Sequence, residues 1–290
     1  MTAPEQPIRL AFSPDSDDIF MFWALLNGKV DAEGLTFTSE RADTETLNLR
    51  AETGAGADVC AVSIAHYARV AKDYLLLPHG MSVGRGYGPV VVTQQAGTKL
   101  EALRGKRIGV PGLRTTAYLV TRLLLPEFAP VVVPIAPYSK IFEELRAGTI
   151  DAALLIHEGR LFYERECTSK VIDIGEEWAR VTAGLPLPLG GNAIRRALGP
   201  ETIAKVSRVC RASIQWAADH ADEVTRALLA AETRDDVGLD RASLDKYLDM
   251  YANADTLDAP ADVRGAIDEL FKRGRAAELL PDDALAEFAP

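Results

Sequence analysis

The segment AALLIHEGRLFY, residues 152–163, joins an apolar run to a histidine, and we begin from this junction. Five apolar residues in a row predict a buried strand, and the run breaks at His157, Glu158 and Gly159. A strand that ends at His157 places an imidazole at the carboxyl edge of a sheet, where open α/β sheets bind their ligands. Because imidazole exchanges a proton near neutral pH, His157 is a candidate catalytic base. The competing interpretation is a capping or hydrogen-bonded surface histidine.

The composition of the 290 residues is that of an ordinary globular protein, with 48% hydrophobic and 26% charged residues. This length predicts one large or two modest domains. The net charge of −10 and the lack of a Lys/Arg cluster argue against a nucleic-acid partner, so we expect a small-molecule partner. No run reaches the roughly 18 apolar residues of a membrane span. The start, MTAPEQPIRLAF, lacks the pattern of a secretory signal, so we expect a cytoplasmic protein.

The three cysteines, Cys60, Cys167 and Cys210, are widely spaced and form no CxxC pair. This spacing predicts neither a zinc site nor a redox centre. We expect all three to be reduced, with Cys60 and Cys210 in the core. We expect no metal and no cofactor.

Acidic residues follow the first apolar run, at Asp15, Asp17 and Asp18. Three carboxylates so close together are a possible metal site. Carboxylates in a first helical turn are also what the helix dipole favours, and Ser16 or Asp17 is a natural N-cap for the amphipathic run that follows. We therefore favour the capping interpretation.

A weak internal echo predicts two α/β lobes of similar construction. The order strand, turn, helix in IRLAF, SPDS and IFMFWALL returns in KRIGV, PGLR and TTAYLVTRLLL, and residues 50–65 share the pattern of residues 144–159. Ser63 and His157 then occupy comparable strand ends and face each other across a cleft. We expect residues 1–92 plus 190–290 to form the first lobe, with a helical C-terminal tail, and residues 93–189 to form the second. The two crossings, near Val92 and Leu189, would form the hinge.

Thr115 and Thr116 open a helix directly after a strand, so their hydroxyls and the free backbone N–H groups suit an anion. Plain N-capping explains one of the two equally well. The glycine-rich loop HGMSVGRGYGP lets the backbone approach a ligand closely. In the helical tail, the aromatic residues fall at helical spacing, which predicts packing against the first lobe. They include Trp216, Tyr247, Tyr251 and Phe271.

Six segments together resemble the 1,4-dihydroxy-6-naphthoate synthase family over about Ile8 to Gly199. They are SPDSDDIFMFWAL, DVCAVSIAHY, GRGYGPVVV, PGLRTTAYLV, ALLIHEGRLFY and LPLPLGGNAIRR. The resemblance implies the periplasmic-binding-protein type II fold, used as a cytoplasmic enzyme in the futalosine route to menaquinone. The implied activity is that of a lyase that converts cyclic dehypoxanthine futalosine into 1,4-dihydroxy-6-naphthoate.

The resemblance also implies roles for individual residues. His157 matches the family's proposed base, which removes a carbon-bound proton. Thr115 and Thr116 match its substrate-binding threonine region and would hold the carboxylate of a small anionic substrate. The remaining candidates would contact the substrate from the first lobe, the glycine-rich loop and the hinge, although cap and turn roles explain them equally well. They are Ser63, Ser82, Gly86, Gly190 and Gly191.

One segment departs from the family pattern. Where we expect Cys-Pro-Asn-Asp-Thr after the Ser-Pro, this chain has Asp-Ser-Asp-Asp-Ile at residues 15–19. The substitution adds negative charge, which an anionic substrate would meet if these positions touch it. Two alternatives stay open: an enzyme like chorismate dehydratase, which shares the fold and pathway, and a non-catalytic protein that binds a small carboxylate.

Overall fold

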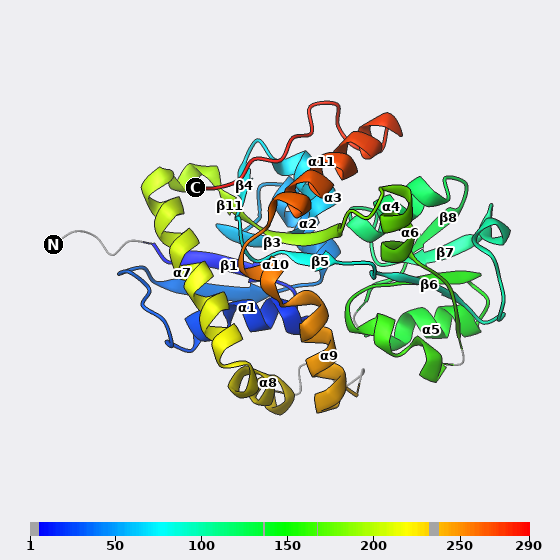
Figure 1. The fold of residues 1–290 in the computed structure, drawn as a ribbon, viewed down its shortest axis with the longest axis horizontal. Helices are drawn as coiled ribbons and strands as arrows, with labels where there is room; N and C mark the ends of the chain where they lie inside the picture. Colours follow the sequence, from blue (N-terminus) through cyan, green and yellow to red (C-terminus); the bar gives the residue numbers. More distant parts are fainter. Residues whose placement is uncertain (1–5, 136, 167, 232–237) are drawn as a thin grey trace.

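Two sheets, each with helices packed on it, form two lobes that lie side by side (Figure 1). The computed structural model describes residues 6–135, 137–166, 168–231 and 238–290. Cys167, for which we predicted a reduced thiol, lies outside this part of the chain. Within the described residues, no helix is both long and apolar enough to cross a membrane.

The first lobe is built on a sheet of order β2-β1-β3-β11-β4, with β5 also paired to β11. β1 is parallel to β2 and β3, and β11 is antiparallel to β3, β4 and β5. The strands are β1 (Ile8–Phe12), β2 (Phe37–Arg41), β3 (Val59–Ser63), β4 (Tyr74–Leu76), β5 (Ser82–Gly84) and β11 (Leu187–Arg195).

The second lobe is built on a sheet of order β10-β6-β9-β7-β8. β7 is parallel to β8 and β9, whereas β6 is antiparallel to β9 and β10. All residues of β6 and β9 are buried, as expected for short apolar runs covered on both faces. The strands are β6 (Val90–Thr93), β7 (Arg107–Val110), β8 (Ala129–Val132), β9 (Ala152–Leu155) and β10 (Ser169–Asp173).

The strand orders confirm the internal echo. The first sheet contains β2-β1-β3-β11 and the second β8-β7-β9-β6, in each case three parallel strands followed by an antiparallel one. β3 and β9 are therefore equivalent. Ser63 ends β3, and His157 lies two residues beyond Leu155, the last residue of β9. The fold delivers both side chains to the carboxyl ends of parallel strands, where such sheets bind ligands.

The two chain crossings lie earlier than the sequence boundaries. β6 belongs wholly to the second sheet, so the boundary at residues 92/93 cuts a strand that packs in the second lobe. β11 belongs to the first sheet, so the boundary at residues 189/190 cuts it as well. Neither boundary could be placed from the sequence, because the pairing partners of each crossing strand are not visible in its own residues.

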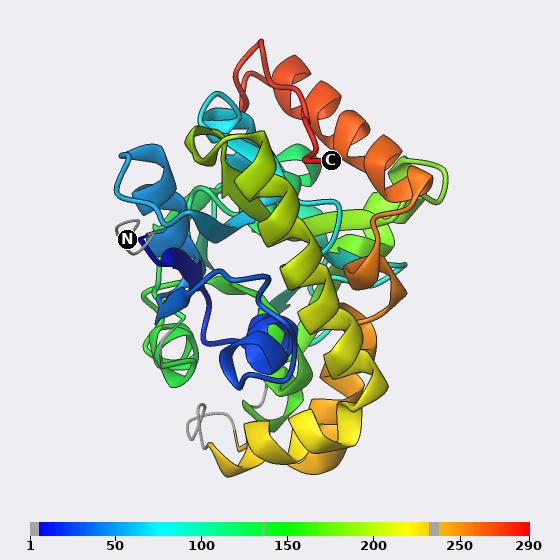
Figure 2. The same cartoon turned by 90° about the vertical axis from the view of Figure 1, so that its left-hand side faces the viewer.

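The helices α1 to α6 alternate with the strands, and α7 to α11 form the C-terminal part. α7 runs along the outer side of the first lobe, away from the second (Figures 1 and 2). The helices are α1 (Ser16–Leu26), α2 (Thr44–Glu52), α3 (Ile64–Val70), α4 (Thr116–Leu124), α5 (Ser139–Arg146), α6 (Ile174–Val181), α7 (Pro200–Asp219), α8 (Ala221–Ala230), α9 (Arg241–Tyr251), α10 (Ala254–Leu257) and α11 (Ala261–Ala276). Short 3₁₀ helices are η1 (Leu100–Leu103), η2 (His157–Leu161), η3 (Tyr163–Glu166) and η4 (Arg196–Leu198).

Packing of α1 against α7 fixes the base of the first lobe. The apolar face of α1 is buried, and Ser213 of α7 donates a hydrogen bond to the carbonyl of Met21 at 2.7 Å. Trp216 of α7 stacks on Trp23, as expected for a tail that packs on this lobe. Cys60 and Cys210 are buried free thiols, as predicted.

Candidate active site

A cavity lies where the strand ends of the two sheets meet. The first lobe contributes Ser63 and the start of α1, and the second contributes His157 and the start of α4. The crossing strand β11 contributes its glycines, and α9 of the C-terminal part closes one side with Tyr247 and Tyr251.

All the predicted site residues except Gly86 line this cavity. Gly86 lies at a turn with a φ of 72°, and a Cβ added there would meet nothing within 4 Å. The left-handed backbone explains the glycine at this position, and its expected contact with a substrate stays a prediction. The lining residues among the predicted ones are Ser63, Ser82, Thr115, Thr116, His157, Gly190 and Gly191.

His157 has a left-handed backbone, with a φ of 49°. Few residues other than glycine adopt this conformation, and such strain collects at functional sites. The imidazole is partly exposed to the cavity, with 21% of its side-chain surface accessible. Its Nε2 lies 3.3 Å from the Thr44 hydroxyl, and its Nδ1 lies 3.4 Å from both Asp15 Oδ2 and the Tyr247 hydroxyl.

Asp17 and Asp18 belong to the cavity and not to a helix cap. The Ser82 hydroxyl donates to Asp17 Oδ2 at 2.7 Å, and Tyr247 donates to Asp17 Oδ1 at 3.0 Å. Asp18 accepts from the N–H of Ser13 at 2.7 Å. Burial raises the pKa of each carboxyl to about 7. Both groups are therefore part protonated near neutral pH, and each can donate or accept a hydrogen bond.

The expected N-cap of α1 is wrong. The N-cap position is Asp15, and its side chain makes no capping bond. Glu158 of the second lobe takes this role instead, since its Oε1 accepts from the Ser16 N–H at 3.0 Å and from the Ser16 hydroxyl at 2.8 Å. A carboxylate at a helix N-terminus is favoured by the dipole, and this one joins the two lobes. Among the described residues, no cluster of three or more Asp, Glu, His or Cys side chains is arranged so that it could hold a metal ion.

The two threonines at the start of α4 have different roles. Thr115 caps the helix, because its hydroxyl accepts from the Tyr118 N–H at 3.1 Å. Thr116 joins the lobes, because its hydroxyl accepts from the Ala65 N–H at 3.0 Å and donates to the Leu189 carbonyl at 2.7 Å. One threonine is thus explained by N-capping, as the sequence allowed, and the other spans the cleft.

Ser63 is held by Asn48 of α2. The Asn48 amide donates to the Ser63 hydroxyl at 3.0 Å and accepts from the Ser63 N–H at 3.0 Å. Opposite it, Gly190 pairs with Ser63 and Gly191 with Val62. A Cβ at Gly191 would lie 3.1 Å from a methyl group of Ile64, so this glycine lets β11 run close to α3. These contacts orient the strand ends toward the cavity.

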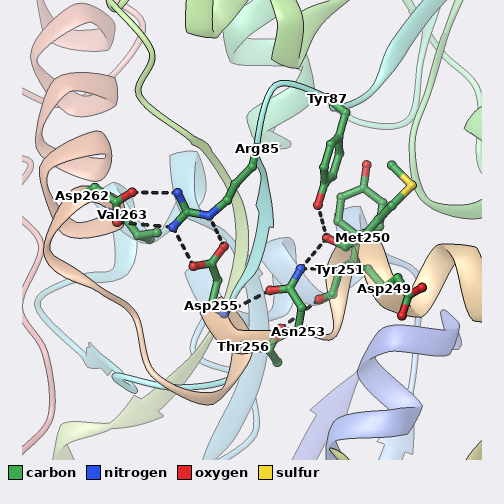
Figure 3. A network of polar contacts seen from close by, with 10 residues as sticks. All are labelled: Arg85, Tyr87, Asp249, Met250, Tyr251, Asn253, Asp255, Thr256, Asp262 and Val263. Atoms are coloured by element: carbon green, nitrogen blue, oxygen red, sulfur yellow. Dashed lines mark hydrogen bonds and ion pairs between the residues drawn. The ribbon is translucent and has the colours of Figure 1, made fainter.

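Tyr247 and Tyr251 are the site residues that the sequence did not reveal. We expected them to pack in the tail, and both are buried, but they also line the cavity beside His157. Their helix α9 is anchored to the loop between β5 and β6, because the Tyr87 hydroxyl donates to the Met250 carbonyl at 2.6 Å (Figure 3). Arg85 of the same loop pairs at 2.7 Å with Asp255 of α10 and Asp262 of α11. Nothing in the local sequence of α9 indicates this placement.

Comparison with known proteins decides the family. The family model described as menaquinone biosynthesis matches residues 8–276. The chain belongs to this family. The menaquinone biosynthesis relatives include a 1,4-dihydroxy-6-naphtoate synthase of Streptomyces coelicolor, 37% identical over 96% of this chain and 98% of the relative. The protein of the same name from Thermus thermophilus is 36% identical over 94% of this chain and 96% of its own length.

Solved structures show the same fold. A protein from Archaeoglobus fulgidus matches with a TM-score of 0.86 and 38% identity, over 96% of this chain and 100% of the other. The alkanesulfonate-binding protein of Xanthomonas axonopodis pv. citri matches with a TM-score of 0.73, 15% identity and 98% coverage of both chains. A Candida albicans protein described as having the generic periplasmic binding protein fold matches with a TM-score of 0.65 and 12% identity, over 93% of this chain and 95% of the other.

These findings confirm the resemblance and the fold. The menaquinone biosynthesis family covers the segments that carried the resemblance and extends into the helical tail, where the sequence showed no motif. The match to named synthases over nearly the full length indicates an enzyme of menaquinone biosynthesis that acts on a small molecule. The binding-protein fold is confirmed by its structural neighbours.

Proposed function

We propose that this enzyme is a 1,4-dihydroxy-6-naphthoate synthase, a carbon-carbon lyase that acts on cyclic dehypoxanthine futalosine. The two named relatives, similar over nearly their whole length, support the substrate. The observation that carries the proposal is the position of His157. Its imidazole follows a parallel strand, has a strained backbone and faces the cavity between the two lobes.

His157 acts as the general base in this proposal. It removes a carbon-bound proton from the substrate and starts the elimination that leaves the aromatic naphthalene ring. General-base catalysis of this kind typically contributes about 10² to 10⁴ in rate. The apolar walls of the cavity exclude water, which strengthens the polar contacts to the reacting group.

The substrate carboxylate is held at the start of α4 in this proposal. The N-terminus of the helix carries a partial positive charge, which favours an anion there. Asp17 and Asp18 also line the cavity, and they favour the hydroxyl groups of the sugar-derived part over a carboxylate. Ser63 contributes a further hydroxyl to the cavity, since it accepts from Asn48 and keeps its own proton for a ligand.

The test is an incubation of the purified protein with cyclic dehypoxanthine futalosine, followed by mass spectrometry, with chorismate in a parallel sample. We expect the naphthoate from the first sample and no change in the second. Conversion of chorismate would instead identify the chorismate dehydratase activity. Tight binding of either compound without conversion would identify a non-catalytic binding protein.

A further inference from the structure

Asp15 stands apart from the other acidic residues of its segment. It is fully buried and is not among the residues that line the cavity, whereas Asp17 and Asp18 are. A substrate in the cavity therefore does not meet the carboxylate of Asp15. The nearest catalytic group is His157, whose Nδ1 lies 3.4 Å from Asp15 Oδ2. The Asp15 carboxylate of this segment thus faces the imidazole.

The groups in contact with the His157 ring determine which of its two nitrogens carries the proton. When Asp17 is ionised, the Tyr247 hydroxyl donates to its Oδ1, so toward His157 Nδ1 it presents only a lone pair. Asp15 Oδ2 is an acceptor as well. These two acceptors favour a ring proton on Nδ1. Nε2 is then the unprotonated nitrogen, and the Thr44 hydroxyl donates to it. In this proposal the bound substrate replaces Thr44 as the partner of Nε2.

We propose that Asp15 is the positioning residue of the catalytic base, and that it completes an Asp–His pair across the cleft. It holds His157 with Nε2 toward the substrate and stabilises the imidazolium that forms when Nε2 takes the proton. Asp15 precedes α1 in the first lobe and His157 follows β9 in the second, so the pair exists only when the lobes are together. The inference deepens the proposed function and rests on it.

Other groups near the His157 ring limit how much the Asp15 carboxylate alone contributes to stabilising the imidazolium. Asp17 of α1 also attracts the imidazolium, and Tyr247 of α9 contacts Nδ1. Glu158 adjoins His157 in the chain, but its carboxylate is bonded to Ser16. These groups remain in a variant that lacks the Asp15 charge, so its loss weakens the preference for the imidazolium without abolishing it.

The first arm of the test needs no substrate. The imidazole titration of the intact protein is followed by NMR in wild type, Asp15→Asn and the control Asp58→Asn, with His157→Asn used to assign the signal. His66 and His79 do not interfere between pH 5 and 8, because burial lowers the pKa of each to about 4. Asp58 pairs with Arg9 and precedes Val59, at the opposite end of β3 from the cavity.

In Asp15→Asn we expect the midpoint of the His157 titration to fall, because a contacting negative charge is lost. Asp58→Asn should leave it unchanged. Equal midpoints in wild type and Asp15→Asn would overturn the proposal. Should Asp15→Asn fail to fold, the ¹⁵N shifts of wild-type His157 decide: a proton on Nδ1 supports the pair, and a proton on Nε2 overturns it.

The second arm uses turnover of cyclic dehypoxanthine futalosine over the same pH range. In Asp15→Asn we expect kcat to fall about tenfold to a hundredfold, less than for loss of the base itself, and the acid limb of the pH profile to move to lower pH. A fall in kcat with an unmoved acid limb would show a merely structural role. If wild type itself does not turn over, the proposed function fails, while the NMR arm still decides the Asp–His pair.

Discussion

The ends of β3 and β9 are equivalent by strand order, yet they do different things. Ser63 ends β3 with a φ of −64° and leads into the α-helix α3, while Asn48 fixes its hydroxyl. His157 follows β9 with a φ of 49° and leads into a 3₁₀ helix, with its ring open to the cavity. The fold supplies the position, and the residues that follow each strand supply the chemistry.

The largest effect is expected when the side chains of Ser63 and His157 are exchanged. In the double variant Ser63→His with His157→Ser, the imidazole stands on the equivalent strand end but lacks Asp15, Thr44 and the left-handed backbone. We expect kcat to be as low as in His157→Ser alone, about 10² to 10⁴ below wild type. Steady-state assay of naphthoate formation measures it. Recovery of activity in the double variant would show that position alone suffices.

A smaller effect is expected at Thr116, which joins α4 of the second lobe to the start of α3 and to β11. Thr116→Val removes the partners of the Ala65 N–H and the Leu189 carbonyl, which costs the closed arrangement about 1 to 3 kcal/mol. We expect substrate to bind about tenfold more weakly, measured by calorimetry, with a smaller change in the rate of bound substrate. Thr116→Ser keeps the hydroxyl and serves as the control. Equal affinity in Thr116→Val and wild type would show that Thr116 does not contribute to substrate binding.

The smallest effect is expected in the pH dependence of stability, which the raised pKa values of Asp17 and Asp18 determine. Burial raises the pKa of Asp17 and Asp18 from an ordinary 3.8 to about 7, so the folded state prefers their protonated forms. Stability from these groups is then greatest below about pH 4, falls as the pH rises to about 7, and is level above that. We expect Tm to fall between pH 5 and pH 7, and Asp17→Asn to flatten the fall. A Tm that rises between pH 5 and pH 7 equally in wild type and Asp17→Asn would contradict the raised pKa values of Asp17 and Asp18.

Local patterns predicted much of the fold and a part of the site. Alternating strand and helix signals gave the two lobes, and the breaks after VCAVS and AALLI gave Ser63 and His157. The cap of α1 could not be predicted, because Glu158 lies 142 residues from Ser16 in the chain. Tyr247 reaches Asp17 from 230 residues away, and its own helix carries only an ordinary packing pattern. Contacts of this kind depend on how the lobes and the tail meet.

Gly86 shows a second limit of sequence patterns. Its loop is rich in glycine, which suits a close approach to a ligand, but its backbone has a φ of 72° and it makes the turn in which Arg85 reaches Asp255 and Asp262. The same residue type serves both purposes. A glycine in the sequence therefore predicts an unusual backbone more safely than it predicts a binding contact.

The most direct test of the central claim is a single-turnover experiment on His157→Asn. The variant is saturated with cyclic dehypoxanthine futalosine, binding is confirmed by calorimetry, and naphthoate is quantified over time against wild type. We predict affinity within about tenfold of wild type and a chemical step slowed by about 10² to 10⁴, since loss of a base raises the barrier and leaves binding in place. Naphthoate formed at the wild-type rate would show that His157 is not the base.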